Sequence, residues 1–240
     1  MWIATISSAR IAGDGRWKVE AYTTDVSGHI ESVFNLAAVR DVVVERREFM
    51  DPQDQPGATV AYVGLENVAP QTGDLIDFSP VRASTIKSRA KVFREGDVLY
   101  GRLRPYLNKV YLAEAPVSAG ICSTEFYVLV PDGSLIHPRF LRELLSSKFI
   151  QDHAPSLQAG SALPRLHLDD LFNMRFPLPP LEVQHAVALE LLTARNHRLR
   201  LTEELTSQPQ RIRQEFERVL TVGLAPSEGS RPSGSLRGAK

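Results

Sequence analysis

The 240-residue sequence lacks the features that define several large classes of protein. It contains one cysteine, Cys122, so no disulfide can form within the chain and a thiolate metal site would lack its other ligands. No segment approaches the about 18 consecutive apolar residues that a membrane-spanning helix requires. The first residues also lack the basic start and apolar stretch of a signal peptide. We therefore expect a cytoplasmic protein without a membrane anchor.

Motifs for common catalytic chemistry are also absent from the sequence. There is no glycine-rich phosphate loop, no dinucleotide-binding glycine pattern and no zinc-binding His-Glu-x-x-His. The six histidines are scattered without the spacing of metal ligands. A metal-dependent nuclease centre would need clustered carboxylates and a nearby lysine, and no lysine follows Glu125 two residues on. We expect no catalytic centre, no metal and no cofactor in this chain.

The formal net charge is zero, with 28 Lys and Arg against 28 Asp and Glu, which excludes a uniformly basic nucleic-acid-binding chain. The charges are nevertheless unevenly placed. Residues 1–80 hold six basic and twelve acidic residues, whereas residues 81–109 hold eight basic and two acidic ones. Residues 110–240 hold fourteen of each. The dense basic segment at 81–109 would attract a polyanion at short range.

The first 170 residues have the pattern of a strand-rich domain with short helices. Apolar, β-branched and aromatic residues cluster at 61–68, 97–103 and 121–130, and turn residues separate these clusters. Apolar residues at helical spacing follow Pro138 and predict a helix over 138–150. The expected fold class is therefore α+β.

The sequence changes character at 177–180, where three prolines in four positions exclude a continuing helix or a central strand. Residues 181–207 then contain neither glycine nor proline. Alternating spacings of four and three, typical of a coiled-coil seam, relate Val187, Leu191, Ala194, Arg198, Leu201 and Leu205. We expect a long helix whose seam packs on a partner helix, with packing on the chain's own domain as the alternative. Pro209 predicts a break or a kink in the helix.

Five motifs, taken in order, resemble the target recognition domain of type I restriction-modification specificity subunits. They are YVGLENV at 62–68, GDVLYGRLRPYLNKV at 96–110, CSTEF at 122–126, GSALPRL at 160–166 and PLPPLEVQ at 177–184. The resemblance covers roughly residues 60 to 220. It implies a non-catalytic protein that binds one part of a split double-stranded DNA site.

The resemblance also implies a domain organisation. Residues 1–59 form the weakly matched N-terminal part of the recognition domain, 60–178 its core, 179–221 the spacer and dimerisation helix, and 222–240 a disordered tail. The family typically carries two recognition domains and two antiparallel spacer helices in one chain. One of each here implies a half-length subunit that forms a homodimer through its spacer helix, with burial of the exposed seam by a methyltransferase as the alternative.

The implied partners are double-stranded DNA and a DNA N6-adenine methyltransferase subunit, which would bind S-adenosylmethionine. The full complex would add an ATP-dependent restriction subunit. The alternative function is a non-catalytic adaptor of a phage-defence complex that acts mainly through its long helix.

The basic segment supplies the candidate DNA contacts. Lysine and arginine side chains would contact phosphates, while Tyr106, Asn108 and some arginines would contact base edges. The candidates are Lys87, Arg89, Lys91, Arg94, Arg102, Arg104, Tyr106, Asn108 and Lys109. Two alternatives stay open: several of these side chains form a solvated face, and Arg102 and Arg104 pair with Glu95 or Asp97.

Overall fold

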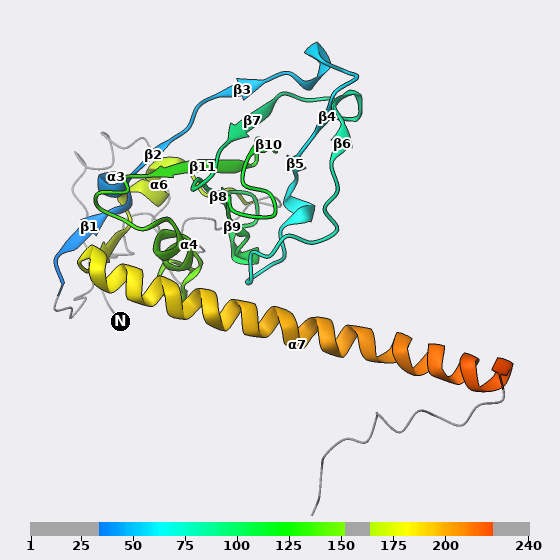
Figure 1. The fold of residues 1–240 in the computed structure, drawn as a ribbon. Coiled ribbons are helices and arrows are strands. Elements are labelled where there is room, and N and C mark those ends of the chain that lie inside the picture. The colour runs from blue at the N-terminus through cyan, green and yellow to red at the C-terminus, as the bar shows by residue number, and fades with distance from the viewer. Residues whose placement is uncertain (1–33, 152–163, 223–240) are drawn as a thin grey trace, which may run out of the picture. The chain divides into compact units, whose positions relative to one another are not determined.

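The computed structural model describes residues 34–151 and 164–222. The chain divides into two units between Ala188 and Leu189. The described part of the first unit contains the strands and short helices, and that of the second unit is the greater part of helix α7 (Leu181–Val222) (Figure 1). Most of the predicted tail lies outside the described residues, as do residues 1–33.

The first unit is built on an antiparallel sheet with the strand order β2-β11-β8-β9. Its strands are β2 (Val43–Glu45), β11 (Phe126–Pro131), β8 (Val98–Gly101) and β9 (Val110–Leu112). Side chains alternate along β11, so that Phe126 and Val128 join one core cluster whereas Tyr127 and Leu129 join another. Both faces of the sheet are therefore buried, which is why the strand segments are apolar almost throughout.

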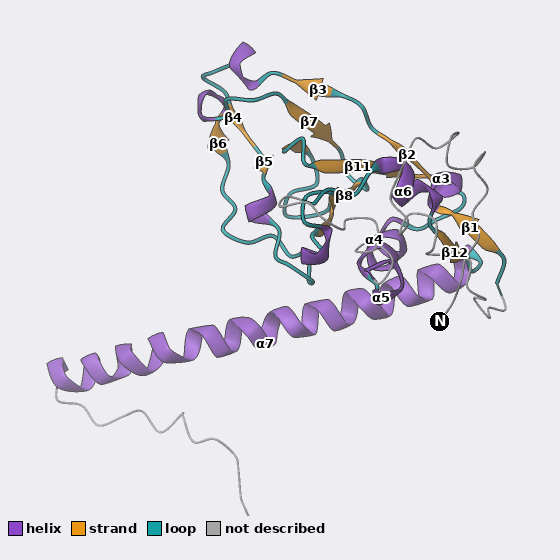
Figure 2. Cartoon of the chain, turned by 180° about the vertical axis from the view of Figure 1, so that it is seen from behind, coloured by secondary structure: helices purple, strands orange, loops and turns teal. Residues whose placement is uncertain are grey.

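One face of this sheet packs against short helices and a two-stranded ribbon (Figures 1 and 2). These elements are α3 (Val39–Val42), α4 (Pro138–Ser146), α5 (Lys148–Gln151), α6 (Leu168–Asn173) and the antiparallel pair β1 (Leu36–Ala38) and β12 (Arg175–Pro177). Leu141, Leu171 and Phe176 from these elements are fully buried in the shared core. Pro138 begins α4, and His137 Nδ1 accepts the Arg139 N–H at 3.2 Å as its cap.

The other face packs against a second sheet with the strand order β3-β7-β10-β5. Its strands are β3 (Phe49–Met50), β7 (Ala90–Phe93), β10 (Gly120–Cys122) and β5 (Tyr62–Val63), of which β10 and β5 are parallel. A ribbon of β4 (Thr59–Val60) and β6 (Val81–Arg82) and four 3₁₀ helices complete the unit: η1 (Pro52–Asp54), η2 (Leu65–Asn67), η3 (Ala83–Thr85) and η4 (Pro105–Leu107). Cys122 is fully buried here, and burial raises the pKa of its thiol to about 12.

The predicted α+β class is confirmed, but three predicted segments are subdivided. The segment 61–68 is a two-residue strand followed by η2. The segment 121–130 is two strands because Ser123 makes a turn, in which its hydroxyl accepts the Glu125 N–H at 3.2 Å. The predicted helix 138–150 is interrupted at Ser147, whose hydroxyl donates to the Leu144 carbonyl at 2.6 Å.

Helix α7 has 42 residues and a length of about 63 Å. It continues through Pro209, so the predicted break at that position is wrong. Proline removes one N–H donor and crowds the carbonyl one turn earlier. The adjacent Gln208, Gln210 and Arg211 are good helix formers, and their preference maintains the helix on both sides of the lost hydrogen bond.

The first turns of α7 belong to the first unit and are fixed there by Gln184, which is completely buried. Its Oε1 accepts the His137 N–H at 2.8 Å. Its Nε2 donates to the carbonyls of Leu135 at 3.0 Å and Pro179 at 2.8 Å. A single side chain therefore joins the prolyl segment, the start of α7 and the start of α4.

Candidate nucleic-acid interface

The basic segment 81–109 does not form one continuous surface. It runs through β6, η3, β7, β8 and η4, so that part of it lies within the sheets and part at their ends. Each candidate side chain therefore has to be placed individually.

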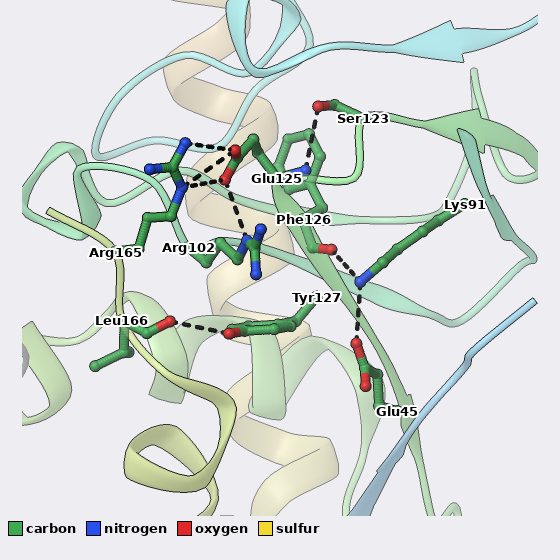
Figure 3. Close-up of polar contacts among 9 residues, drawn as sticks. All are labelled: Glu45, Lys91, Arg102, Ser123, Glu125, Phe126, Tyr127, Arg165 and Leu166. Carbon is green, nitrogen blue, oxygen red and sulfur yellow. Dashed lines mark hydrogen bonds and ion pairs between the residues drawn. The ribbon is translucent and has the colours of Figure 1, made fainter. Parts of the chain in front are cut away.

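Lys91 and Asn108 are inside the domain, with 6% and 4% of their surface exposed. Lys91 Nζ donates to Glu45 Oε1 at 3.0 Å and to the Phe126 carbonyl at 2.8 Å (Figure 3). Asn108 Nδ2 donates to Gln71 Oε1 at 3.1 Å and to the Ser146 carbonyl at 2.8 Å. These two predicted DNA contacts are corrected to internal structural roles, because each group is enclosed and satisfied by the chain's own acceptors.

Lys87 and Lys109 bind main-chain carbonyls. Lys109 Nζ, which is half-buried, donates to the Leu65 carbonyl at 2.6 Å and so joins the start of β9 to η2. Lys87 Nζ donates to the Ser84 carbonyl at 2.7 Å but stays exposed on the surface. Of this pair, Lys87 is the one accessible to a polyanion.

Arg94 and Arg102 are paired with carboxylates. Arg94 forms a bidentate ion pair with Glu48 at 2.7 and 2.9 Å, and the two side chains are 50% and 46% exposed. Arg102 Nε donates to Glu125 Oε2 at 3.1 Å. The alternative in which Arg102 pairs with Glu95 or Asp97 names the wrong carboxylate, because Arg46 occupies Asp97 through two hydrogen bonds.

Arg89, Arg104 and Tyr106 are exposed candidates. The Arg89 guanidinium lies over the ring of Phe49 at 5.1 Å, a cation–π contact at the edge strand β3. Arg104 has a left-handed backbone (φ 48°) just before η4, and its N–H donates to the Pro164 carbonyl at 2.8 Å. Tyr106 follows within η4. These side chains are displayed on ordered backbone.

Arg165 joins this group although the basic segment does not contain it. Its Nε and Nη2 donate to Glu125 at 2.8 to 3.2 Å, so that one carboxylate holds both Arg165 and Arg102 (Figure 3). The hydrogen bonds from Arg165, aided by Arg102, lower the pKa of Glu125 against the opposing effect of burial. Arg165 lies within the GSALPRL motif, which was its only signal in the sequence.

The second unit displays an apolar helix face. Of the predicted seam, Val187, Leu191 and Arg198 are half-buried, while Ala194, Leu201 and Leu205 are exposed. Large exposed apolar side chains continue beyond the seam at Ile212, Phe216 and Leu220. Leu205, Ile212 and Phe216 line one shallow groove together with Pro209.

The described residues lack two other classes of site. No group of three or more His, Cys, Asp or Glu side chains in residues 34–151 and 164–222 is arranged to hold a metal ion. No helix within those ranges is long and apolar enough to cross a membrane.

The fold and the site together define a class of protein. In this class an α+β domain with a buried central sheet exposes arginines at its surface, and the chain continues into a long helix with an apolar face. The chain is similar in sequence and in fold to specificity subunits of type I restriction-modification systems. No protein-family model matches it.

Two relatives illustrate the similarity. The type I restriction enzyme EcoDI specificity subunit of Escherichia coli is 27% identical over 136 residues, which are 57% of this chain and 29% of the relative. The HsdS subunit of Thermoanaerobacter tengcongensis has a TM-score of 0.61 and 27% identity, covering 83% of this chain and 51% of that one. The chain therefore spans about a third of the curated relatives and half of the solved ones.

Proposed function

We propose that the chain is a sequence-specific, non-catalytic DNA-binding subunit that directs a DNA N6-adenine methyltransferase to its target site. The observation that carries the proposal is the match to specificity subunits in both sequence and fold over most of the chain. The first unit would be the target recognition domain, with α7 as the spacer helix.

The proposed partners follow from this role. The chain would bind double-stranded DNA and a methyltransferase subunit that holds S-adenosylmethionine, and a full complex would include an ATP-dependent restriction subunit. A single recognition domain contacts one part of a split site. A homodimer formed through α7 would supply the second part, and the complex would act in the cytoplasm.

The exposed basic side chains support the DNA-binding part of the proposal. Lys87, Arg89 and Arg104 are accessible, and Arg102 and Arg165 are partly so. Because the whole chain is electrically neutral, nonspecific attraction to DNA would be weak. Selective binding would then depend on the assembled complex, in which the methyltransferase adds contacts of its own.

The test is selection from a random duplex pool at fixed salt, with the chain alone and with its methyltransferase. We expect weak binding by the chain alone and enrichment of one split motif by the complex. Enrichment of no motif in either case would contradict sequence recognition.

The exposed apolar face of α7 favours one other candidate, an adaptor that acts through the helix. Charge reversal at the exposed Lys87, Arg89 and Arg104 discriminates the two functions. An adaptor would keep both partner binding and complex activity in this variant, whereas a specificity subunit would keep partner binding and lose DNA selection.

A further inference from the structure

Glu125 lies in the short connection between β10 and β11 and holds two guanidinium groups (Figure 3). Arg165 donates Nε and Nη2 to it, with the shortest contact at 2.8 Å, and Arg102 donates Nε at 3.1 Å. The Glu125 side chain is 22% exposed, against 33% for Arg102 and 41% for Arg165. The carboxylate is therefore the more enclosed of the three groups, and both cations are more open to solvent.

The backbone fixes these arginines relative to one another. Residues 102–104 pair with 164–166 through a bridge between Leu103 and Arg165. The Arg104 N–H donates to the Pro164 carbonyl at 2.8 Å, and the Leu166 N–H donates to the Arg102 carbonyl at 3.0 Å. The Tyr127 hydroxyl donates to the Leu166 carbonyl at 2.9 Å and ties the pair to the central sheet. An arrangement this rigid loses little conformational freedom when a ligand binds.

The charges of this cluster do not cancel. Glu125 supplies one negative charge, while Arg102 and Arg165 supply two positive ones, and the exposed Arg104 adds a third on the same backbone pair. Among the described residues, Arg165 Nη1 has no hydrogen-bond partner and remains available as a donor. The hydrogen bonds from Arg165 to Glu125 are exposed, and exposed ion pairs contribute little to folding stability, so stability alone is a weak reason for the second arginine on this carboxylate.

We propose that Arg165, together with Arg102 and Arg104, binds a backbone phosphate of the target DNA, and that Glu125 is the positioning residue for the first two. The proposal rests on the proposed function and adds Arg165, which lies outside the basic segment, to the DNA contacts. A guanidinium group donates several hydrogen bonds in a fixed plane, which suits phosphate oxygens.

A phosphate fits this site better than a base edge. The Arg102 guanidinium lies 5.8 Å from the centre of the Tyr127 ring, and the Arg165 guanidinium is held on Glu125, so both end groups are retained at the domain surface. Base edges lie within a groove about 8.5 Å deep, whereas phosphates form the outer surface of the duplex. Retained side chains therefore reach phosphates first.

The experiment measures the binding of a labelled random-sequence duplex to the purified full-length chain over a series of KCl concentrations. It compares wild type with Arg165→Gln, Arg165→Lys and the charge-matched control Arg40→Gln, since Arg40 is an exposed arginine on α3. For Arg165→Gln we expect the slope of log K against log salt to fall by about one. At moderate salt its binding should be roughly ten-fold weaker, as for the loss of one phosphate contact.

Arg165→Lys keeps the charge and can keep an ion pair with Glu125, so it should retain most of the slope, and Arg40→Gln should match wild type. Thermal melts followed by circular dichroism establish that each variant is folded at the temperature of the binding assay. If Arg165→Gln does not fold, Arg102→Gln takes its place, because Glu125 also holds Arg102. A slope equal to that of Arg40→Gln would then refute the phosphate site, and a slope lower by about one supports it.

Three results would overturn the phosphate site. The first is an unchanged slope in a folded Arg165→Gln variant. The second is a loss confined to one DNA sequence, which would indicate a base contact. The third is lost methyltransferase binding with an unchanged DNA slope, which would indicate an acidic protein surface as the partner.

The proposed function can fail separately. If the wild-type chain selects no motif but its salt slope depends on Arg165, the phosphate site stands and the recognition function is refuted. If the wild-type chain selects a motif and Arg165→Gln has the wild-type salt slope, the recognition function stands and the phosphate site is refuted. Absence of any DNA binding by wild type, alone and with its methyltransferase, would overturn both.

Discussion

Ion pairs of the first unit differ in how deeply their charges are buried, and burial decides the role of each charge. Lys91 and Glu45 both have side chains less than a tenth exposed, and Lys91 Nζ also donates to the Phe126 carbonyl of the central sheet. Burial raises the pKa of Glu45, but hydrogen bonds and charge from Lys91 and Arg47 outweigh it, so that the pKa is lowered overall. Lys91 is thus a buried link between the two sheets.

We predict that Lys91→Met destabilises the fold by about 2 to 4 kcal/mol, because the substitution leaves the buried Glu45 Oε1 and the Phe126 carbonyl without their donor. The measurement is the free energy of unfolding in urea. Lys87→Met, at an exposed position, is the control and should change that free energy by less than about 0.5 kcal/mol. A stable Lys91→Met variant with a reduced salt slope for DNA binding would instead place Lys91 in the interface.

The sequence predicts the presence of a basic segment but not which of its charges reach solvent. Lys91 and Arg89 are two positions apart, yet one is enclosed by Glu45 and the other lies over Phe49 at the surface. Their difference depends on Glu45, which is 46 residues from Lys91 in the chain. Arg165 was missed for the same reason, because its partner Glu125 is 40 residues away and no local pattern relates them.

At the scale of elements, the junction between α4 and α7 concentrates polar groups. His137 caps α4 through Nδ1, and its ring makes an edge contact with that of His185 on α7 at 4.7 Å. Burial lowers the pKa of His137, and the nearby His185 and Arg139 lower it further. The neutral imidazole is therefore the form that fits the junction, because a protonated Nδ1 cannot accept the Arg139 N–H.

This shift predicts that the junction destabilises the fold at acidic pH. The unfolded chain binds a proton at His137 near pH 6.5, whereas the folded chain binds it only at lower pH. The contribution of His137 to the free energy of unfolding is therefore fully present above about pH 6.5. It decreases as the pH falls from there to the pKa of His137 in the folded chain, and it does not change further at lower pH.

The variant His137→Asn should remove part of this pH dependence while retaining a cap for α4. The free energy of unfolding, measured by urea titration from neutral to mildly acidic pH, should fall less steeply than in wild type. His197→Asn, at an exposed position on α7, is the control and should leave the slope unchanged. Equal slopes in wild type and His137→Asn would contradict the assignment.

Pro209 gives a second prediction at this scale. It lies inside the continuous helix α7, where proline costs up to about 3 kcal/mol relative to alanine. Pro209→Ala should therefore raise the thermal stability of the helical signal in circular dichroism, whereas Gln210→Ala should change it by only a few tenths of a kcal/mol, roughly. No gain in Pro209→Ala would show that the proline is accommodated by a bend that alanine does not remove.

The elements that the sequence predicts well are those whose signal is local. The start of α4 at Pro138 and the length of α7 follow from residues within the element itself. The interruptions at Ser123 and Ser147 depend on a single hydroxyl bonding its own neighbours, and the apolar pattern of each segment conceals them. The pairing of residues 102–104 with 164–166 depends on contacts far along the chain, so no periodicity indicates it.

At the scale of the whole molecule, the second unit exposes an apolar face on helix α7. Leu205 and Ile212 are 68% and 69% exposed, and they are seven residues apart, which is one heptad. Burying one large aliphatic side chain contributes about 1.5 to 3 kcal/mol, so several such residues from two helices would stabilise a dimer. A second copy of this chain would present the same face and is the occupant consistent with the proposed split DNA site.

The last prediction is that Leu205→Glu combined with Ile212→Glu abolishes self-association, because like charges would then meet at the dimer seam. Gln210→Glu combined with Gln214→Glu adds the same charge to the opposite helix face and is the matched control. Light scattering should find wild type and the control as dimers and the seam variant as a monomer. A dimer would also bring two recognition domains to one DNA, so wild type should select a palindromic two-part motif with a fixed spacer. A monomeric wild type, both alone and within the methyltransferase complex, would contradict the homodimer and leave the apolar face to the methyltransferase.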